Sequence, residues 1–443
     1  MIFHTEKSKR LFLIISVVII LGFIISIGWK DRVSAINKET YEKLKIFTDV
    51  LSMVQRHYVE EVDTEKLLYG AINGMLDVLD PHSSFMPPDI FKEMRVETKG
   101  SFGGLGIEIT MKEGVLLVIS PIEDTPAYQA GIKAGDHILM VDGKHTKNMS
   151  LMDAVKLMRG TPGTKATITI MRKGLSKPKD YTITRAIIKI KSVKYWVLEE
   201  GYGYTRINHF QDKTAYELKV ALSKLEAEGD GLKGLILDLR NNPGGTFDQA
   251  LKVSDEFLDS GIITYTEERV KGKRQVFKAK RAGIDHDYPM IVLVNAGSAS
   301  ASEIVAGALQ DNGRALILGV QTFGKATVQS IYPLEDGSGL RLTIGRYYTP
   351  KGRSIQAEGI VPDIVVNNDL PLGVEAKNNI KFLRERDLER HFKGLNEDEE
   401  KQEDIINEIE EEEDIADAQL ERALEILKSW NIFKENMKIR EAS

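Results

Sequence analysis

The stretch Met290-Ile-Val-Leu-Val-Asn-Ala-Gly-Ser-Ala-Ser-Ala-Ser-Glu303 decides the fold of this 443-residue chain. It begins with five consecutive apolar residues, which is the pattern of a strand buried on both faces of a sheet. Small residues follow, and Ser300 stands three residues before Glu303, a spacing typical of a helix N-terminus. A buried strand that passes directly into a helix indicates a layered α/β core.

The same alternation of strand and helix continues on the N-terminal side of this stretch. Gly203–Ile207 and the apolar run Gly234–Arg240 are predicted strands, and helices are predicted from Thr214 and from Phe247. On the C-terminal side, Asp336-Gly-Ser-Gly339 predicts a hairpin turn. We therefore expect an α/β core across residues 187–370.

Ser300 and Lys325 together offer a hydrolase site that needs no histidine. Ser300 follows a buried strand, where the active sites of α/β sheets collect, and a helix N-terminus supplies N–H groups for an oxyanion. Lys325 can act as the base if burial lowers its pKa. The alternatives are a simple helix cap at Ser300 and a surface charge at Lys325.

Lys325 also completes a decoy motif, because Gly319-Val-Gln-Thr-Phe-Gly-Lys325 fits a phosphate-binding P-loop. Ala326 stands where that motif needs a hydroxyl to bind magnesium, which disfavours the nucleotide interpretation. Gln329 lies four residues after Lys325. In an extended strand this even spacing places both side chains on one face, where the glutamine would orient the amine.

Two glycine-containing turns are candidate binding elements. Arg240-Asn-Asn-Pro-Gly244-Gly245 follows a predicted strand, and either glycine could bring an N–H group to an oxyanion. The alternative is a plain turn. Gly103, Gly104, Leu105, Gly106 and Ile107 form a glycine-bearing loop that leads into a strand. Such a loop can present N–H groups to the carboxylate at the end of a peptide chain.

Composition excludes several classes of protein. The chain has no cysteine, and its eight histidines are scattered, so we expect no metal and no cofactor, although the sequence leaves a carboxylate-only metal site open. No dense basic and aromatic surface is present, so nucleic acid is not an expected partner. Residues 397–414 hold twelve acidic residues and one lysine, which indicates a solvated acidic run.

The N-terminus predicts a membrane-spanning helix. Leu11 to Gly28 is uncharged, strongly apolar and preceded by basic residues. We expect an uncleaved anchor in the inner, cytoplasmic membrane, with the catalytic body on the periplasmic side. The alternative is secretion to the periplasm after signal cleavage near Val33-Ser34-Ala35.

These patterns divide the chain into five parts. Residues 1–35 are the anchor or signal segment, 36–96 a helical region, 97–186 a compact module of strands and two short helices, 187–370 the α/β core, and 371–443 a charged tail. Within the tail, Asp417 to Trp430 predicts an amphipathic helix, which could pack on the core or on another subunit of a homodimer.

Taken together, these motifs resemble the carboxyl-terminal processing peptidases, also called tail-specific proteases. The resemblance covers residues 45–430 and is most specific at Asn295–Glu303 and Thr322–Gln329. It implies a layered α/β serine protease core with an inserted PDZ domain at residues 97–186. It also assigns Ser300 as nucleophile, Lys325 as general base and Gln329 as an assisting residue.

The resemblance implies a mechanism and partners as well. Oxyanion donors would be Ala301 and either Gly244 or Gly245, and the loop from Gly103 to Ile107 would bind a substrate's C-terminal carboxylate. Protein substrates are the expected partners, and an accessory regulator is a further candidate. Arg159, at the end of the predicted PDZ helix, is a hypothetical link between peptide capture and catalysis. The rival hypothesis is a peptide-binding scaffold with an inert core.

Overall fold

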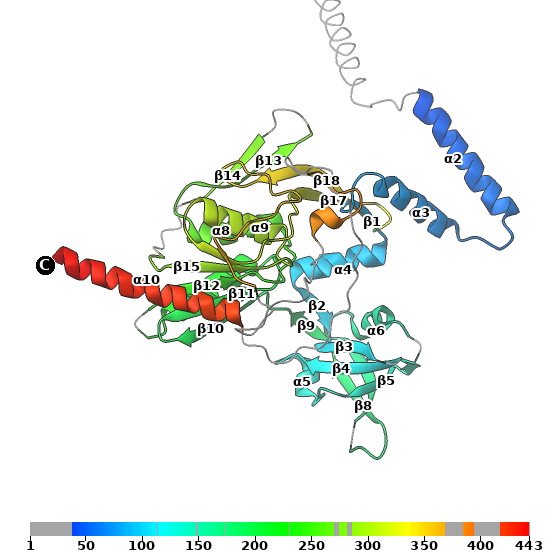
Figure 1. Cartoon of the computed structure of the whole chain (residues 1–443). Helices are drawn as coiled ribbons and strands as arrows, with labels where there is room; N and C mark the ends of the chain where they lie inside the picture. The colour runs from blue at the N-terminus through cyan, green and yellow to red at the C-terminus, as the bar shows by residue number, and fades with distance from the viewer. Residues whose placement is uncertain are drawn as a thin grey trace, which may run out of the picture. The chain divides into compact units, whose positions relative to one another are not determined.

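The computed structural model describes residues 38–112, 114–147, 149–172, 174–229, 231–269, 274–280, 286–367, 384–393 and 417–442 (Figure 1). The chain forms two compact units, which divide after Ala71. Within the described ranges, no helix is long and apolar enough to cross a membrane. The predicted span from Leu11 to Gly28 lies outside them.

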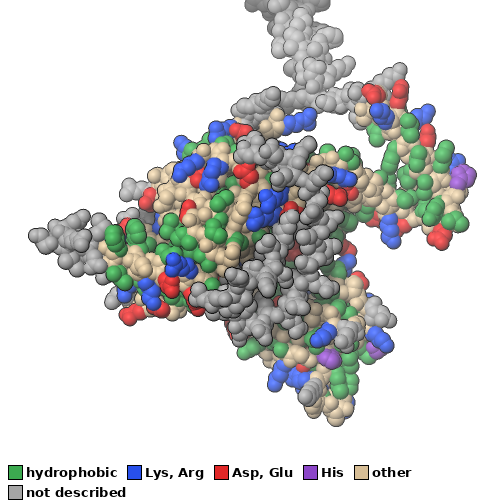
Figure 2. All heavy atoms as spheres, viewed as in Figure 1, with side chains coloured by type: hydrophobic (Ala, Val, Ile, Leu, Met, Phe, Trp, Pro, Cys, Tyr) green, Lys and Arg blue, Asp and Glu red, His purple; other side chains and the backbone are tan. Residues whose placement is uncertain are grey.

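The smaller unit contains α2 (Lys38–His57) and the start of α3 (Thr64–Asp77). Apolar residues repeat along α2 at helical spacing, and they remain exposed: Leu44, Ile46, Phe47, Val50 and Met53. Figure 2 shows hydrophobic side chains gathered over this region.

A six-stranded sheet forms the centre of the larger unit. Its order is β10 (Val193–Glu199), β11 (Tyr202–Ile207), β12 (Gly234–Asp238), β15 (Met290–Val294), β16 (Leu316–Gly319) and β19 (Ile364–Val365). The pair β10 and β11 is antiparallel, and the other neighbours are parallel. All residues of β12 and β15 are buried, as their continuous apolar sequences predict.

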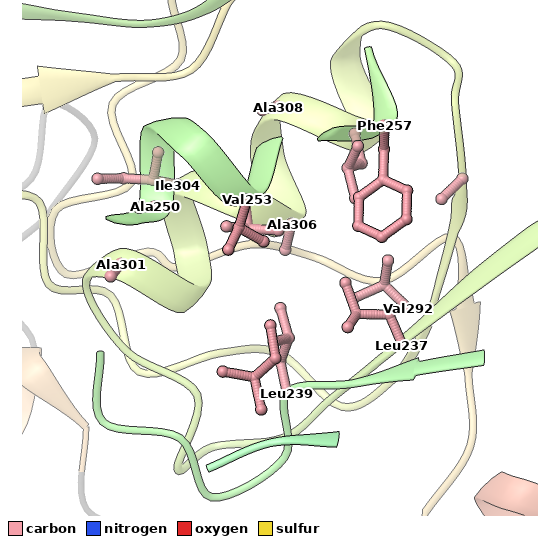
Figure 3. Close-up of a cluster of buried hydrophobic side chains, with 14 of the residues drawn as sticks. Leu237, Leu239, Ala250, Val253, Phe257, Val292, Ala301, Ile304, Ala306 and Ala308 are labelled. Atoms are coloured by element: carbon pink, nitrogen blue, oxygen red, sulfur yellow. The ribbon is translucent and has the colours of Figure 1, made fainter. Parts of the chain in front are cut away.

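Helices cover both faces of this sheet. The helices α7 (Thr214–Glu226), α8 (Phe247–Phe257) and α9 (Ala301–Asp311) share one hydrophobic core with one face, and α10 (Ala418–Ala442) packs on the other. Because side chains alternate along a strand, Leu235 and Leu237 face the layer formed by α7, α8 and α9, and Ile236 faces α10. Figure 3 shows Val253 of α8 on the side of the helix that faces Leu237 and Val292 of the sheet.

A second sheet lies beside this core. Its order is β1 (Ser84–Met86), β18 (Gly339–Tyr348), β13 (Ile262–Glu268) and β14 (Arg274–Lys278), and β17 (Thr327–Pro333) also pairs with β18. The predicted hairpin therefore forms as β17 and β18, which are antiparallel. Lys325 stands just before β17, so this sheet fixes the position of the candidate base.

Residues 101–189 form a compact module, at the place where the sequence predicts one across residues 97–186. Helix α4 (Pro88–Lys99) leads into β2 (Ser101–Gly104), which pairs with β9 (Ala186–Lys189) and so brings the entry and exit of the module together. Between them lie β3 (Ile107–Lys112), β4 (Val115–Pro121), α5 (Pro126–Gln129), β5 (His137–Val141), β6 (Lys144–His145), α6 (Leu151–Met158), β7 (Lys165–Met171) and β8 (Lys179–Thr184). The module has its own hydrophobic core, in which Leu116, Ile138 and Ile168 are fully buried.

Candidate active site

Ser300 lies where β15 passes into α9. Its backbone has φ 54° and ψ −110°, a conformation that residues with a side chain rarely adopt and that collects at functional sites. The neighbouring Ser298 and Ser302 are buried, and their hydroxyls each donate to a backbone carbonyl at 2.8 Å. Ser300 is only partly buried, so it is the serine of this segment that a substrate can reach.

The carboxylate of Glu303 connects the backbone at Ser300 to the backbone at Lys325 by hydrogen bonds. Glu303 is fully buried, and one of its oxygens accepts hydrogen bonds from the Thr322 hydroxyl at 2.6 Å and the Gly324 N–H at 2.8 Å. The other oxygen accepts from the N–H groups of Ser300 at 2.8 Å and Lys325 at 3.0 Å. Burial raises the pKa of Glu303 to about 7, although these four hydrogen bonds act in the opposite direction.

Tyr347 makes a second connection between the two candidate residues. Its hydroxyl, carried by β18, lies within hydrogen-bond distance of the carbonyl oxygens of Ser300 and Lys325. Burial raises the pKa of this hydroxyl well above its ordinary value, so it stays protonated and acts as a donor. The backbones of Ser300 and Lys325 are therefore fixed relative to each other by one carboxylate and one phenol.

Lys325 has the electrostatic surroundings that a lysine base requires. Burial holds its pKa below the ordinary lysine value, because the ammonium form loses its hydration, and the positive charge of Arg341 acts in the same direction. The carboxyl groups of Glu385, Glu303 and Asp80 oppose this shift. The net lowering of the Lys325 pKa increases the fraction of neutral amine, which is the form that can accept a proton.

Gln329 does not make the contact that its spacing predicts. The strand β17 begins at Thr327, after the lysine, and its register with β18 shifts between Val328 and Gln329. Gln329 shares one face of β17 with Thr327, and the regular strand does not extend back to Lys325. The Gln329 amide instead donates to the Thr327 hydroxyl at 2.7 Å. In the described part of the chain, no hydrogen bond joins the Lys325 amine to Gln329 or to the Ser300 hydroxyl.

Gly244, in the Arg240–Gly245 turn, packs against Ser300. A Cβ atom added at Gly244, where φ is 104°, would lie 2.9 Å from the Ser300 Cβ and 3.0 Å from the Ala301 nitrogen. The Gly244 N–H already donates to the Asn242 side chain at 2.9 Å. Among the hydrogen bonds of the described residues, none uses the N–H of Gly245 or of Ala301 as its donor. Both groups are available to a ligand.

Arg240 anchors the start of this turn. Its guanidinium donates to Asp238 and binds both carboxylate oxygens of Asp417 at 2.7 Å, and the Tyr204 hydroxyl donates to Asp238 at 2.5 Å. Burial raises the pKa of Asp417, but the hydrogen bonds and charge of Arg240 outweigh this effect and hold it below its usual value. The C-terminal helix region is thus tied to the glycine turn by a largely buried ionic network.

The predicted peptide-binding loop lies between β2 and β3 of the module. Gly103 and Gly104 end β2, Leu105 and Gly106 form the link, and Ile107 begins β3. The carbonyl oxygen of Gly106 accepts a hydrogen bond from the Thr125 hydroxyl at 3.1 Å, which fixes the loop. Within the described residues, the N–H groups of Leu105 and Gly106 donate no hydrogen bond. They are therefore free to bind a carboxylate.

Arg159 lies at the C-terminal cap of α6 and contacts α4. It pairs with Glu93, and its guanidinium carbon lies 4.4 Å from the centre of the Phe102 ring. One turn earlier, Lys156 pairs with Asp89 at 2.7 Å. Two ion pairs therefore hold the module's helix α6 against α4, the helix that precedes the module.

The structure adds site residues that the sequence interpretation did not single out. The sequence indicates a helix cap for Glu303, and none of its motifs includes Tyr347. A buried glutamate at the third helical position has the same sequence signature as an ordinary capping box. Its contacts with the loop that carries Lys325 (residues 320–326, the lysine loop) could therefore not be inferred. Tyr347 had no signal, because nothing in the sequence places its strand beside both candidate residues.

We expect Glu303→Gln to lower kcat/KM about 100-fold, because a small displacement of positioned groups has an effect of this order. In either orientation the glutamine NH2 group would face at least one backbone N–H, which loses its acceptor at a cost of about 1–3 kcal/mol. The measurements are cleavage of an unstructured protein and thermal unfolding, with the exposed Glu335→Gln as the matched control. A Glu303→Gln enzyme with unchanged activity would show that the carboxylate does not position the site.

Three families match parts of the chain. Peptidase family S41 matches residues 201–366, a PDZ domain matches residues 103–182, and the activating protease CtpB N-terminal domain matches residues 28–89. A carboxy-terminal-processing protease from Bartonella bacilliformis is 49% identical over 362 residues, which are 81% of this chain and 83% of that protein. The chain belongs to the carboxy-terminal processing protease family.

Other members of the family are also similar to this chain. A probable CtpA-like serine protease from Staphylococcus aureus is 34% identical over 398 residues, 88% of this chain and 79% of that protein. Among solved structures, the photosystem II D1 C-terminal processing protease is 34% identical and covers 72% of this chain and 92% of its own, with a TM-score of 0.43. The predicted family, the mixed α/β protease fold with a PDZ domain, and the serine-type peptidase activity are confirmed.

Proposed function

We propose that Ser300 is the nucleophile and Lys325 the general base of an endopeptidase that cleaves proteins near their C-termini. The observation that carries this proposal is the double connection of the two residues through the Glu303 carboxylate and the Tyr347 hydroxyl. Ser-Lys pairs are a known variant of the serine hydrolase site. The strained backbone of Ser300 and the lowered pKa of Lys325 support the same roles.

The chemistry then proceeds through an acyl-enzyme. Neutral Lys325 accepts the proton of the Ser300 hydroxyl as the oxygen attacks a peptide carbonyl. The resulting ammonium gives its proton to the leaving amine, and the acyl group remains esterified to Ser300. A water molecule, deprotonated by the same amine, attacks the ester, and collapse of the second tetrahedral intermediate releases the acid and returns the proton to Ser300.

We assign the oxyanion to the N–H groups of Ala301 and Gly245. Two N–H donors directed at the developing negative charge are the usual arrangement in acyl transfer. Gly245 is favoured over Gly244, because the Gly244 N–H is already bound to Asn242. Gly244 has the separate role of allowing the turn to approach the Ser300 Cβ, which a side chain at this position would prevent.

Gln329 retains the role of an assisting residue by resemblance to the family. It lies on β17, four residues after Lys325, and its present partner is Thr327. Catalytic hydrogen bonds often form only when substrate is bound. We therefore expect Gln329 to contact the Lys325 amine in the complex with substrate.

Substrate capture is assigned to the PDZ domain. The free N–H groups of Leu105 and Gly106 would bind the terminal carboxylate, within the loop that runs from Gly103 to Ile107. Arg159 would couple capture to catalysis through its ion pair with Glu93, because a peptide bound beside α6 would disturb that contact. The division of the chain at residues 96, 186 and 370 is part of the same proposal.

We place the catalytic body outside the cytoplasm, on the periplasmic side of the inner membrane, with residues 11–28 as the anchor. The alternative is release to the periplasm after cleavage of this segment. The support is the uncharged apolar sequence from Leu11 to Gly28 and its basic flank.

Two substrates that differ only at the C-terminus test capture and coupling together. We expect an unstructured polypeptide with a free carboxylate to bind about 10–100-fold more tightly than its amidated form, because the hydrogen bonds involve a charged group. Arg159→Ala should keep this difference in binding but lose the accompanying difference in kcat, and the exposed Lys165→Ala, on β7 of the same module, is the control. Equal binding of the two substrates would exclude the capture role of the PDZ loop. If Arg159→Ala keeps the difference in kcat between the two substrates, Arg159 has no coupling role.

A further inference from the structure

A short segment beyond the predicted core packs against the lysine loop. Residues 384–393 include the 3-10 helix η2 (Glu385–Asp387). The Glu385 N–H donates to the carbonyl oxygen of Phe323 at 3.2 Å, and the Arg384 guanidinium donates to the Gln321 side chain at 2.7 Å. This segment was expected to be part of a charged tail, yet its contacts lie within two to four residues of Lys325.

The Glu385 side chain reaches the backbone beside Lys325 through one amide. Its carboxylate is fully buried, with both oxygens 2.8 Å from His82 Nε2. The amide of Gln356 donates to Glu385 at 2.9 Å, and the oxygen of the same amide accepts from the Ala326 N–H at 3.0 Å. Since Gln356 is also fully buried, its amide has little freedom to turn.

These contacts complete the restraint of the lysine loop. The carbonyl of Gly324 accepts a hydrogen bond from the Ala357 N–H at 2.8 Å, and the Phe323 N–H donates to Ser298 at 3.1 Å. With the contacts of Glu303 and Tyr347 described above, the loop is held from α9 and β18. Glu385 holds the loop from a third direction, and it lies more than 50 residues after Lys325 in the sequence.

Glu385 is also one of the charges that act on the lysine amine. The groups that do so are Arg341 on β18, Glu303 on α9, Asp80 before β1 and Glu385 on η2. Asp80 is held in place by the N–H and the hydroxyl of Ser83, at 2.9 Å and 2.6 Å. Loss of one negative charge from this set would favour the neutral amine, because less stabilisation would remain for the ammonium form.

We propose that Glu385, held by His82 and Gln356, is a positioning residue for the base: it fixes the backbone of the lysine loop and sets part of the charge around the Lys325 amine. This inference rests on the proposed function, since it assumes that Lys325 is the base. It assigns a role in the active site to a segment that lies outside the residues matched by the peptidase family.

Two substitutions separate charge from position. Glu385→Gln keeps the size of the side chain and removes its charge, so the rising limb of the kcat/KM–pH profile should move to lower pH. Glu385→Asp keeps the charge and shortens the side chain, so the limb should stay in place while kcat falls about 10–100-fold, with KM nearly unchanged. The matched control is Glu389→Gln, an exposed glutamate of the same segment.

The outcomes distinguish this inference from the proposed function. A folded Glu385→Gln enzyme with an unshifted profile, or a folded Glu385→Asp enzyme with unchanged kcat, would overturn the inference while wild-type catalysis by Lys325 stands. If both variants fail to fold, Glu385 supports the whole domain rather than the lysine loop, which also overturns it. Activity that survives Lys325→Ala would instead overturn the proposed function itself.

Discussion

Lys325→Arg is expected to abolish proteolysis, with a fall in kcat/KM of at least about 10⁴-fold, as for the loss of a member of a catalytic unit. Arginine keeps a positive charge and a long side chain, but its guanidinium is not deprotonated in proteins and cannot accept the serine proton. The exposed Lys351→Arg is the matched control for a lysine-to-arginine change. The measurement is the rate of cleavage of an unstructured protein with an apolar C-terminus.

The same substitution tests the pH dependence of the wild-type enzyme. Because burial holds the pKa of Lys325 below the ordinary lysine value, the neutral fraction rises with pH over a range below that value. Wild-type kcat/KM should therefore rise with pH as the Lys325 ammonium loses its proton. Residual activity in Lys325→Arg should lack this rising limb. A Lys325→Arg enzyme that keeps both its activity and the limb would exclude Lys325 as the base.

Ser300→Ala is expected to have the second large effect, again at least about 10⁴-fold in kcat/KM. The variant loses the nucleophile, whereas the oxyanion donors, the lysine and the peptide-binding loop remain, so binding of C-terminal peptides should be retained. Ser298→Ala is not a clean control, because its buried hydroxyl donates to Leu239 and its loss would disturb the segment. A better control is the exposed Ser223→Ala on α7.

Two results would contradict the role of Ser300. The first is a folded Ser300→Ala enzyme that still cleaves the substrate. The second is a loss of peptide binding equal to the loss of cleavage, which would indicate a damaged fold rather than a missing nucleophile. Thermal unfolding of the variant, compared with that of the wild type, decides whether the fold is intact.

The core of this fold was predictable from short-range patterns. The apolar run Met290–Val294 is long enough for a buried strand and too short for a buried helix, and the small residues after it leave one arrangement, a tight passage into α9. The first glycine of the P-loop-like motif, Gly319, also has a local explanation. A Cβ at Gly319 would lie 2.0 Å from the Val294 carbonyl oxygen, so a neighbouring strand, rather than a phosphate, requires glycine there.

Other parts of the site depend on contacts that sequence spacing does not encode. Lys325 lies before β17, which begins at Thr327, so the alternation that would place Lys325 and Gln329 on one face does not reach the lysine. Glu385 and His82 are 303 residues apart in the sequence. Their buried contact could not be inferred from a segment that is charged and short, and that reads as a solvated tail.

The central claim, that Ser300 carries the acyl group, has a direct test. The anchor-deleted enzyme would be mixed with a peptide ester, quenched in acid during turnover, and digested so that mass spectrometry locates the acyl group. We predict one adduct, an ester on Ser300, which is absent from Ser300→Ala and forms far more slowly in Lys325→Arg. An acyl group on a different residue, or turnover of the ester by Ser300→Ala, would contradict the account.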